Sequence, residues 1–197
     1  MRILHVSDIH CNAEALTRVV KLESFDLLLA TGDYECLDVV DTLASCCSGR
    51  ALAVTGNLDD VAIRRALDRK GLLLDGRVLS FGNLAVAGVG GIDYRSDVER
   101  LRRVTSGSKV DVLLSHHPPK GVLDRALLGV NIGLAAIGEL ARLLKPKLHL
   151  FGHVHESPGE AFYDGVVAVN PGPLFEGRYA LIEMLEAGKV KVSLKRA

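Results

Sequence analysis

The sequence predicts an α/β protein in which two mixed β-sheets pack together and helices cover the outside. Three observations support this fold class. In the first two thirds of the chain, short apolar runs alternate with segments whose apolar residues have helical spacing. The apolar runs are continuous, as in parallel strands that are buried on both faces. From Ala161 onwards only strand-like runs and turns follow, which adds antiparallel strands to the parallel ones.

The first part of the chain repeats a strand–helix pattern three times. Strands are predicted over residues 3–6, 27–30 and 51–54, and helices over 13–23, 36–46 and 59–70. Asp59 and Asp60 open the third helix, and Gly71 closes it. This order predicts parallel strands that are joined by right-handed crossovers.

The pattern changes after Gly71. Strands over 72–80 and 84–89 flank Phe81-Gly82-Asn83 and predict a hairpin. A polar helix over 95–104, a strand over 110–114, an irregular stretch over 118–130, a helix over 134–144 and a strand over 148–151 follow. A second hairpin is predicted at 186–189. The sequence contains no repeat, low-complexity segment or linker, so residues 1–197 are expected to form a single domain.

Composition excludes several classes of protein. The chain has 197 residues, 48% of them hydrophobic, and its 24 Lys and Arg balance its 24 Asp and Glu. This composition is typical of a globular domain and excludes a disordered chain. Zero net charge argues against nucleic acid or an acidic membrane as the main partner. Apolar runs stay below the roughly 18 residues of a membrane span, and the N-terminus is typical of a first strand rather than a signal peptide.

The cysteines predict an intracellular location. The four cysteines show no Cys-x-x-Cys spacing, and two of them are neighbours, which does not favour a disulfide framework. We therefore expect free thiols in a reducing cytoplasm. The residues concerned are Cys11, Cys36, Cys46 and Cys47.

Residues that can bind a metal follow five of the predicted strands. The segments are Ser7-Asp8-Ile9-His10, Thr31-Gly32-Asp33, Thr55-Gly56-Asn57, Ser115-His116-His117-Pro118 and Gly152-His153-Val154-His155. Carboxyl ends of strands converge on one crevice in an α/β sheet, and the Asp-x-His and His-x-His spacings place both side chains on one side. Carboxylate and amide oxygens mixed with imidazole nitrogens suit Mn, Fe, Zn, Co or Ni.

Each segment taken alone has an ordinary structural explanation, such as a helix cap or a turn. The glycines before three of the candidates predict a turn or a close backbone approach there. Five such segments in this order, each at a strand end, make coincidence remote.

The series D-x-H, G-D, G-N, H-H-P and G-H-x-H resembles the calcineurin-like metallophosphoesterases, most closely their small single-domain prokaryotic members. The resemblance extends from Arg2 to about Asn170. It implies a four-layer α/β/β/α sandwich and a centre with two divalent metal ions, from among Mn, Fe, Zn, Ni and Co. By position, one ion would be bound by Asp8, His10 and His155, and the second by Asn57, His116 and His153, with Asp33 bridging them. Asp33, Asn57 and His116 are the catalytic residues that this resemblance implies.

The resemblance also implies an activity, the hydrolysis of a small phosphate ester. Two cations about 3.5–4 Å apart can clamp a phosphoryl group and lower the pKa of a bridging water, whose hydroxide would attack phosphorus. Many relatives have His where this chain has Leu58, in Gly56-Asn57-Leu58-Asp59. Some small prokaryotic relatives also lack this histidine and are associated with phosphodiesters, so the resemblance implies that phosphodiesters are preferred over monoesters. Because leucine cannot protonate a leaving group, substrates with poor leaving groups should react slowly. Asp59 and His117 are alternative proton donors, although a helix cap is the favoured interpretation of Asp59.

Other polar residues have a structural interpretation that we favour. Asn170-Pro171-Gly172-Pro173 is interpreted as a turn between strands rather than as part of the cleft. Arg95 and Arg178 are interpreted as surface residues, although either could bind phosphate. His5 and His149 lie within strands and are expected in the core.

Three alternative functions remain open at this point: a scaffold without turnover, a small nuclease, and a cyclic-nucleotide phosphodiesterase. The apolar helix over 134–144 could form a homo-oligomer interface. Four of the seven His would lie in the cleft, where two divalent cations would attract a phosphate anion despite the neutral chain.

Overall fold

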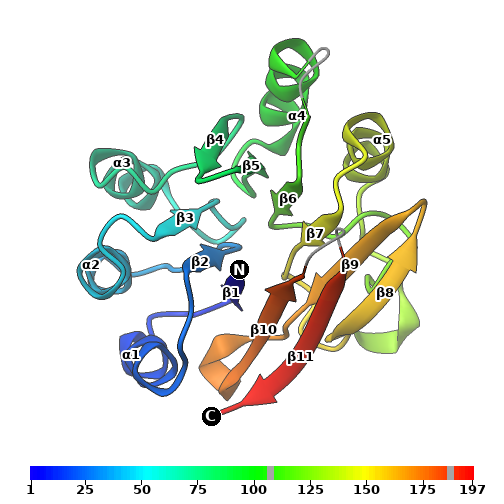
Figure 1. The fold of residues 1–197 in the computed structure, drawn as a ribbon. Coiled ribbons are helices and arrows are strands. Elements are labelled where there is room, and N and C mark those ends of the chain that lie inside the picture. Colours follow the sequence, from blue (N-terminus) through cyan, green and yellow to red (C-terminus); the bar gives the residue numbers. More distant parts are fainter. Residues whose placement is uncertain (106–108, 186–188) are drawn as a thin grey trace.

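The computed structural model describes residues 1–105, 109–185 and 189–197, which form two mixed sheets flanked by helices (Figure 1). The first sheet has the order β11-β10-β1-β2-β3, and the second has the order β4-β5-β6-β7-β9-β8. The first sheet consists of β1 (Arg2–Val6), β2 (Leu27–Ala30), β3 (Ala51–Ala53), β10 (Arg178–Met184) and β11 (Val190–Arg196). The second consists of β4 (Val78–Phe81), β5 (Leu84–Val89), β6 (Val112–Ser115), β7 (Leu148–Leu150), β8 (Gly159–Tyr163) and β9 (Val166–Asn170).

Helices cover the outer faces of the two sheets. The helices α1 (Ala13–Leu22), α2 (Leu37–Cys46) and α3 (Val61–Arg69) lie beside the first sheet, at the left of Figure 1. The helices α4 (Tyr94–Val104) and α5 (Ala135–Leu144) lie beside the second. Two short 3-10 helices, η1 (Leu127–Gly129) and η2 (Leu174–Glu176), lie in connecting segments.

Three apolar clusters separate the four layers. On β1, Leu4 packs in the cluster beneath α1–α3, whereas its neighbour Ile3 packs between the two sheets. On β6, Leu114 faces the space between the sheets and Leu113 faces α4 and α5. Because the strands contribute apolar side chains to both faces, their sequences are continuous apolar runs. The predicted α/β/β/α sandwich of two mixed sheets is confirmed.

Most predicted elements are confirmed within a few residues, and β1, β2 and β3 are parallel neighbours. The β4–β5 hairpin forms at the predicted place, with Phe81 paired to Leu84. The strand predicted over 72–80 is wrong, because a turn at Gly76 (φ +64°) interrupts it and only β4 pairs beyond that turn. The 3-10 helix η2 also lies where only strands and turns were expected.

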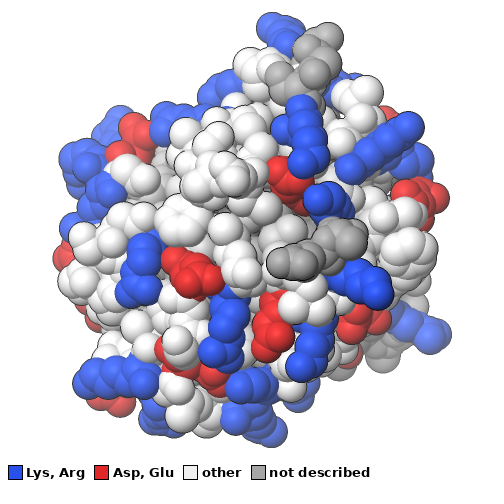
Figure 2. Space-filling view, in the orientation of Figure 1, with Lys and Arg blue, Asp and Glu red and all other residues white. Residues whose placement is uncertain are grey.

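The predicted hairpin at 186–189 falls mostly on residues 186–188, which lie outside the described ranges. The strands on either side, β10 and β11, pair antiparallel, and Met184 is the partner of Val190. None of the helices in the described parts of the chain is long and apolar enough to cross a membrane. Basic and acidic side chains are mixed on the face shown in Figure 2, in line with the net charge of zero.

The expectation of free thiols is wrong for two of the four cysteines. Cys11 and Cys36 form a disulfide, with their Cα atoms 5.0 Å apart. They are 25 residues apart in sequence, but they follow the parallel neighbours β1 and β2, so their loops run side by side. Cys46 and Cys47 are free thiols, as expected. A disulfide is typical of oxidising compartments, so this pair does not favour the reducing cytoplasm.

Removing this disulfide is expected to destabilise the protein. Closing a loop of this length restricts the unfolded chain and contributes about 3.5 kcal/mol to the free energy of unfolding. Urea unfolding of Cys36→Ser should therefore show that loss relative to the unaltered oxidised chain. Cys46→Ser, which changes a free thiol, is the control. Equal free energies of unfolding for the chain and Cys36→Ser would contradict the assigned pairing.

His5 and His149 are fully buried within the strands, which confirms that they are core residues. The His5 Nε2 lies 3.0 Å from the Thr31 hydroxyl. The two nitrogens of His149 lie 2.8 Å from the Ser115 Oγ and 2.6 Å from the Tyr163 hydroxyl. Burial lowers the pKa of each imidazole from 6.5 to about 3.

These two imidazoles should make the fold sensitive to acid. A pKa that falls on folding favours the folded state above the unfolded value of 6.5, and this stability is lost as the pH falls from 6.5 toward 3. Between pH 7.5 and 5.5 each should cost the metal-free protein about 1.4 kcal/mol. Urea unfolding at both pH values should show a pH dependence smaller by that amount in His149→Gln. An unchanged pH dependence in this variant would contradict the assignment.

Candidate metal centre

The structure brings all seven predicted metal-binding residues to one end of the two sheets. They lie after the C-terminal ends of β1, β2, β3, β6 and β7. Within each sheet these strands are parallel, so their C-terminal ends lie on the same side. Their side chains meet in two adjoining groups with a common member. The residues are Asp8, His10, Asp33, Asn57, His116, His153 and His155.

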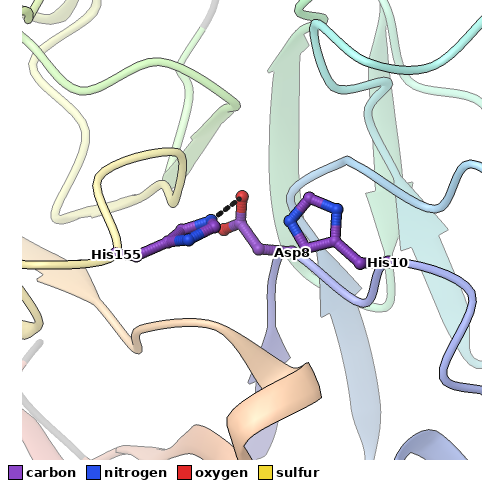
Figure 3. Close-up of side chains that lie close together, drawn as sticks. All are labelled: Asp8, His10 and His155. Atoms are coloured by element: carbon purple, nitrogen blue, oxygen red, sulfur yellow. Dashed lines mark ion pairs between the residues drawn. The ribbon is translucent and has the colours of Figure 1, made fainter.

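The first group consists of Asp8, His10 and His155, with Asp8 between the two imidazoles (Figure 3). One potential ligand atom from each residue lies within 4.8 Å of the others. The His155 Nε2 is 3.2 Å from the Asp8 Oδ1, and the two imidazole centroids are 5.4 Å apart.

The second group surrounds His116. Its Nε2 lies 2.7 Å from the Asn57 Oδ1 and 3.5 Å from the Asp33 Oδ2. Ligand atoms of Asp8, Asp33 and His116 lie within 4.8 Å of one another, so Asp8 belongs to both groups. The centroid of the His153 ring is 5.0 Å from that of the His116 ring. The backbone N–H of His153 donates to the Asp8 Oδ2 at 3.0 Å.

Hydrogen bonds through Nδ1 orient two imidazoles so that Nε2 faces the centre. The His116 Nδ1 donates to the Thr31 carbonyl at 2.7 Å, because a carbonyl oxygen only accepts. The His10 Nδ1 donates in the same way to the Glu35 carboxylate at 2.8 Å. Each bond fixes the ring with its Nε2 toward the centre, as the hydrogen-bond partners of metal-binding histidines do. The His116 Nε2 contacts the Asn57 Oδ1 there at 2.7 Å, and a cation held by both atoms would replace this contact.

Among the described residues, two buried polar atoms of the first group make no hydrogen bond, the Asp8 Oδ1 and the His10 Nε2. The Asp8 Oδ1 has only its ion-pair contact with the His155 Nε2 at 3.2 Å. A buried polar atom without a partner costs free energy, and a divalent cation would satisfy both atoms. The oxygen and nitrogen donors present also suit first-row transition metals. The residues therefore fit a metal ion.

The pKa shifts of Asp8 and His153 favour the forms that bind cations at pH 7, whereas the pKa of Asp33 is shifted the other way. Burial raises the pKa of Asp8, but the contacts with His155 and Ser7 and the charge of His116 outweigh it and lower the pKa to about 2. Burial, helped by His116, lowers the pKa of His153 from 6.5 to about 4, so the imidazole is neutral at pH 7. Burial raises the pKa of Asp33, partly opposed by His116.

The backbone is strained at four of the seven residues. The φ angles are +52° at Asp8, +46° at His10, +55° at Asp33 and +68° at His153. These values lie in the left-handed region, which residues other than glycine rarely adopt. Such strain persists at functional sites, where the surrounding structure holds it in place.

The turn or close approach predicted at each of three glycines is confirmed. Gly32 has φ +100°, and a Cβ there would overlap the Gly56 backbone and the His116 ring. A Cβ on Gly152 would overlap the Ser7 hydroxyl and the Asp8 carboxylate, and a Cβ on Gly56 would overlap the Asp33 carboxylate. The absence of a side chain at these three positions lets the strand ends come together.

His117 also lies at the centre, so five of the seven histidines gather there rather than four. Its ring is 4.6 Å from that of His153 and 5.1 Å from that of His116. Burial, with the charges of His116 and His153, lowers its pKa from 6.5 to about 3. In the sequence, the place of His117 directly after the candidate ligand His116 indicated that it lies near the centre.

Phe175 and Asn170 support the centre from the C-terminal part of the chain. The Phe175 ring lies 5.2 Å from His10 and 5.5 Å from His155, and no sequence motif indicates this contact. Asn170 is buried at the end of β9, and its Oδ1 accepts from the Gly172 N–H at 2.9 Å in the segment that follows. Its amide donates to the Val154 carbonyl at 2.8 Å, which holds the backbone between His153 and His155.

The two arginines considered for phosphate binding have surface contacts. Arg95 is exposed and donates to the Tyr94 hydroxyl at 3.2 Å. Arg178 forms an ion pair with Glu176 at 3.2 Å. Both contacts agree with the surface interpretation.

Known structures share this fold at low sequence identity. TT1561 of Thermus thermophilus has a TM-score of 0.75 and 21% identity, covering 98% of this chain and 97% of that one. An archaeal protein described as a novel phosphodiesterase has a TM-score of 0.63 and 15% identity over 99% and 100% of the two chains. A dimetal phosphatase from Danio rerio has a TM-score of 0.66 and 12% identity over 100% and 98%.

Sequence comparison gives the family. The Caenorhabditis elegans UPF0046 protein T07D4.2 is 43% identical over 51 residues, a match that covers 25% of this chain and only 13% of that protein. Residues 1–185 match the model of the calcineurin-like phosphoesterase superfamily domain, which is nearly the whole chain. The chain therefore belongs to the calcineurin-like phosphoesterase superfamily.

Proposed function

We propose that this metal-dependent phosphoesterase hydrolyses small phosphodiesters at a centre of two metal ions. The observation that carries the proposal is the pair of adjoining ligand groups, one around Asp8 and the other around His116. Seven donors exceed what one ion needs, because transition metals in such sites take about four to six ligands.

The first ion would be held by the first ligand group. The second would be held by the group around His116. The resemblance to the family implies Asp33 as the ligand shared by the two ions, and Asp8, which belongs to both groups by distance, would lie beside it. The residues are Asp8, His10 and His155 for the first ion and Asn57, His116 and His153 for the second. When bound, such ions neutralise phosphate charge and lower the pKa of a water.

The side chains of this centre position the reaction partners. The neutral imidazole of His153 and the ionised carboxylate of Asp8 present lone pairs at pH 7 without a proton to displace. The Leu58 N–H donates to the Asp33 Oδ1 at 2.9 Å, which fixes the shared carboxylate.

The preference for diesters is proposed from the resemblance to small family members that, like this chain at Leu58, lack a histidine and are associated with phosphodiesters. Leu58 is 57% exposed at the position where many relatives have a histidine. A leucine cannot donate a proton to the leaving oxygen, so substrates with good leaving groups should react faster. The similarity to an archaeal phosphodiesterase favours the same substrate class.

A pair of chromogenic substrates tests this proposal. With Mn²⁺ present, kcat/KM for bis-p-nitrophenyl phosphate should exceed that for p-nitrophenyl phosphate, and a chelator should abolish both activities. Faster cleavage of the monoester would contradict the proposed substrate class. No turnover of either ester, with metal bound, would favour a scaffold.

The variant Leu58→His is expected to gain activity on esters with poor leaving groups. An imidazole at this position could supply the missing proton, an effect typically worth about 10²–10⁴-fold. The measurement is kcat for a phenyl phosphate ester, with Leu58→Gln as the control for polarity alone. An equal gain in Leu58→Gln, or no gain in Leu58→His, would contradict this role of position 58.

A further inference from the structure

Asp59 is a buried carboxylate between two loops of the metal centre, and only 7% of its surface is exposed. Its oxygens accept four backbone hydrogen bonds, two on each atom. The Oδ1 accepts from the N–H groups of Tyr34 and Glu35, each at 2.8 Å. The Oδ2 accepts from those of Asp33 at 3.1 Å and Gly56 at 2.7 Å.

The predicted helix cap is wrong for Asp59. The N-cap of α3 is the next residue, Asp60, whose carboxylate accepts from the Ile63 N–H at 2.9 Å. Asp59 points instead toward the ends of β2 and β3. Its two buried oxygens accept hydrogen bonds from backbone N–H groups outside α3, so Asp59 does not cap this helix.

The four amides belong to residues next to, or in, the ligand groups. Asp33 is the proposed shared ligand, and Gly56 immediately precedes Asn57. Glu35 accepts from the His10 Nδ1 and so orients a third candidate ligand. One carboxylate therefore links the loop after β2, which carries Asp33 and Glu35, to the loop after β3, which carries Asn57.

The arrangement requires a carboxylate. Four N–H groups that converge on one point form a positive environment, which an anion with four acceptor sites satisfies. An asparagine has a single acceptor oxygen, and in either orientation its NH₂ group would face two backbone donors. A neutral substitute would therefore leave buried donors without partners.

We propose that Asp59 is a positioning residue that sets the distance between Asp33 and Asn57, and through Glu35 the orientation of His10, before any metal binds. The inference rests on the metal centre proposed above, but not on the proposed substrate. It assigns Asp59 no contact with metal or substrate. Its effect should appear in metal affinity.

The variants Asp59→Asn and Asp60→Asn form a matched pair, because they make the same change at adjacent positions of the chain. Mn²⁺ is titrated into the metal-free full-length protein by calorimetry, and thermal unfolding is recorded alongside. We expect Asp59→Asn to weaken Mn²⁺ binding by about 10- to 100-fold. Asp60→Asn should lower only the unfolding temperature, and Asp59→Glu should restore part of the affinity.

Equal Mn²⁺ affinities for the unaltered chain and Asp59→Asn would overturn the inference, even if the variant is less stable. Absence of Mn²⁺ binding by the unaltered chain is a different result, which would contradict the metal centre itself.

If Asp59→Asn fails to fold, hydrogen exchange of the unaltered metal-free chain tests the same arrangement. The amides of Tyr34, Glu35 and Gly56 should be strongly protected although they lie in loops. Exchange of these amides at the rate of exposed loop residues would overturn the inference.

Discussion

Replacing Asp33 with asparagine is expected to lower kcat/KM for phosphodiester hydrolysis by at least about 10³-fold, which corresponds to about 4 kcal/mol of transition-state stabilisation. Asp33 is 3% exposed, and its Oδ2 lies 3.5 Å from the His116 Nε2. The substitution keeps the size of the side chain but removes one of the two carboxylates in the ligand set. Two divalent cations would then share only the charge of Asp8, and the resulting repulsion should release one of them.

Steady-state kinetics with Mn²⁺, together with the number of ions bound, measures this effect. Asp164→Asn is a suitable control, because Asp164 is a surface residue that forms an ion pair with Arg142 at 3.2 Å. Full activity in Asp33→Asn would contradict the assignment of Asp33 as the shared ligand.

Replacing Gly152 with alanine is expected to lower activity by about 10²-fold, since a displacement of about 1 Å at a catalytic group has effects of this size. The added methyl group would overlap the Asp8 carboxylate and the Ser7 hydroxyl that donates to it. Asp8 contributes to both ligand groups, so its displacement should disturb the whole centre.

Gly138→Ala provides the matched control. Gly138 lies in α5, where the nearest neighbour of an added Cβ would be at 3.7 Å, and alanine is favoured in helices. The measurement is kcat/KM for the chromogenic diester in both variants. Equal activity in Gly152→Ala and Gly138→Ala would contradict the tight packing of the centre around Gly152.

The sequence was sufficient to predict the layers of the fold and the meeting of the strand ends. Both follow from local signals: continuous apolar runs such as 27–30 mark buried strands, and polar residues such as Asp33 and Asn57 follow directly after them. The break at Gly76 was missed because the segments on both sides are strand-like. In the folded chain, the φ of +64° at Gly76 and the bond from the Arg77 N–H to the Leu74 carbonyl reveal the turn.

Contacts between distant segments could not be predicted in the same way. The Cys11–Cys36 pairing depends on two loops that become neighbours only after β1 and β2 pair. Phe175 in η2 contacts His10, although the two residues are far apart in the sequence. At Asp59, a position next to a helix favours a cap, and only the folded loops show four amides around its carboxylate.

The most direct test of the two-ion centre is anomalous diffraction from crystals of the protein grown with Mn²⁺. We predict two manganese peaks that both adjoin the Asp33 carboxylate, one beside the first ligand group and the other beside the second. The first group is Asp8, His10 and His155, and the second is Asn57, His116 and His153. A single peak, or peaks away from Asp33, would contradict the account.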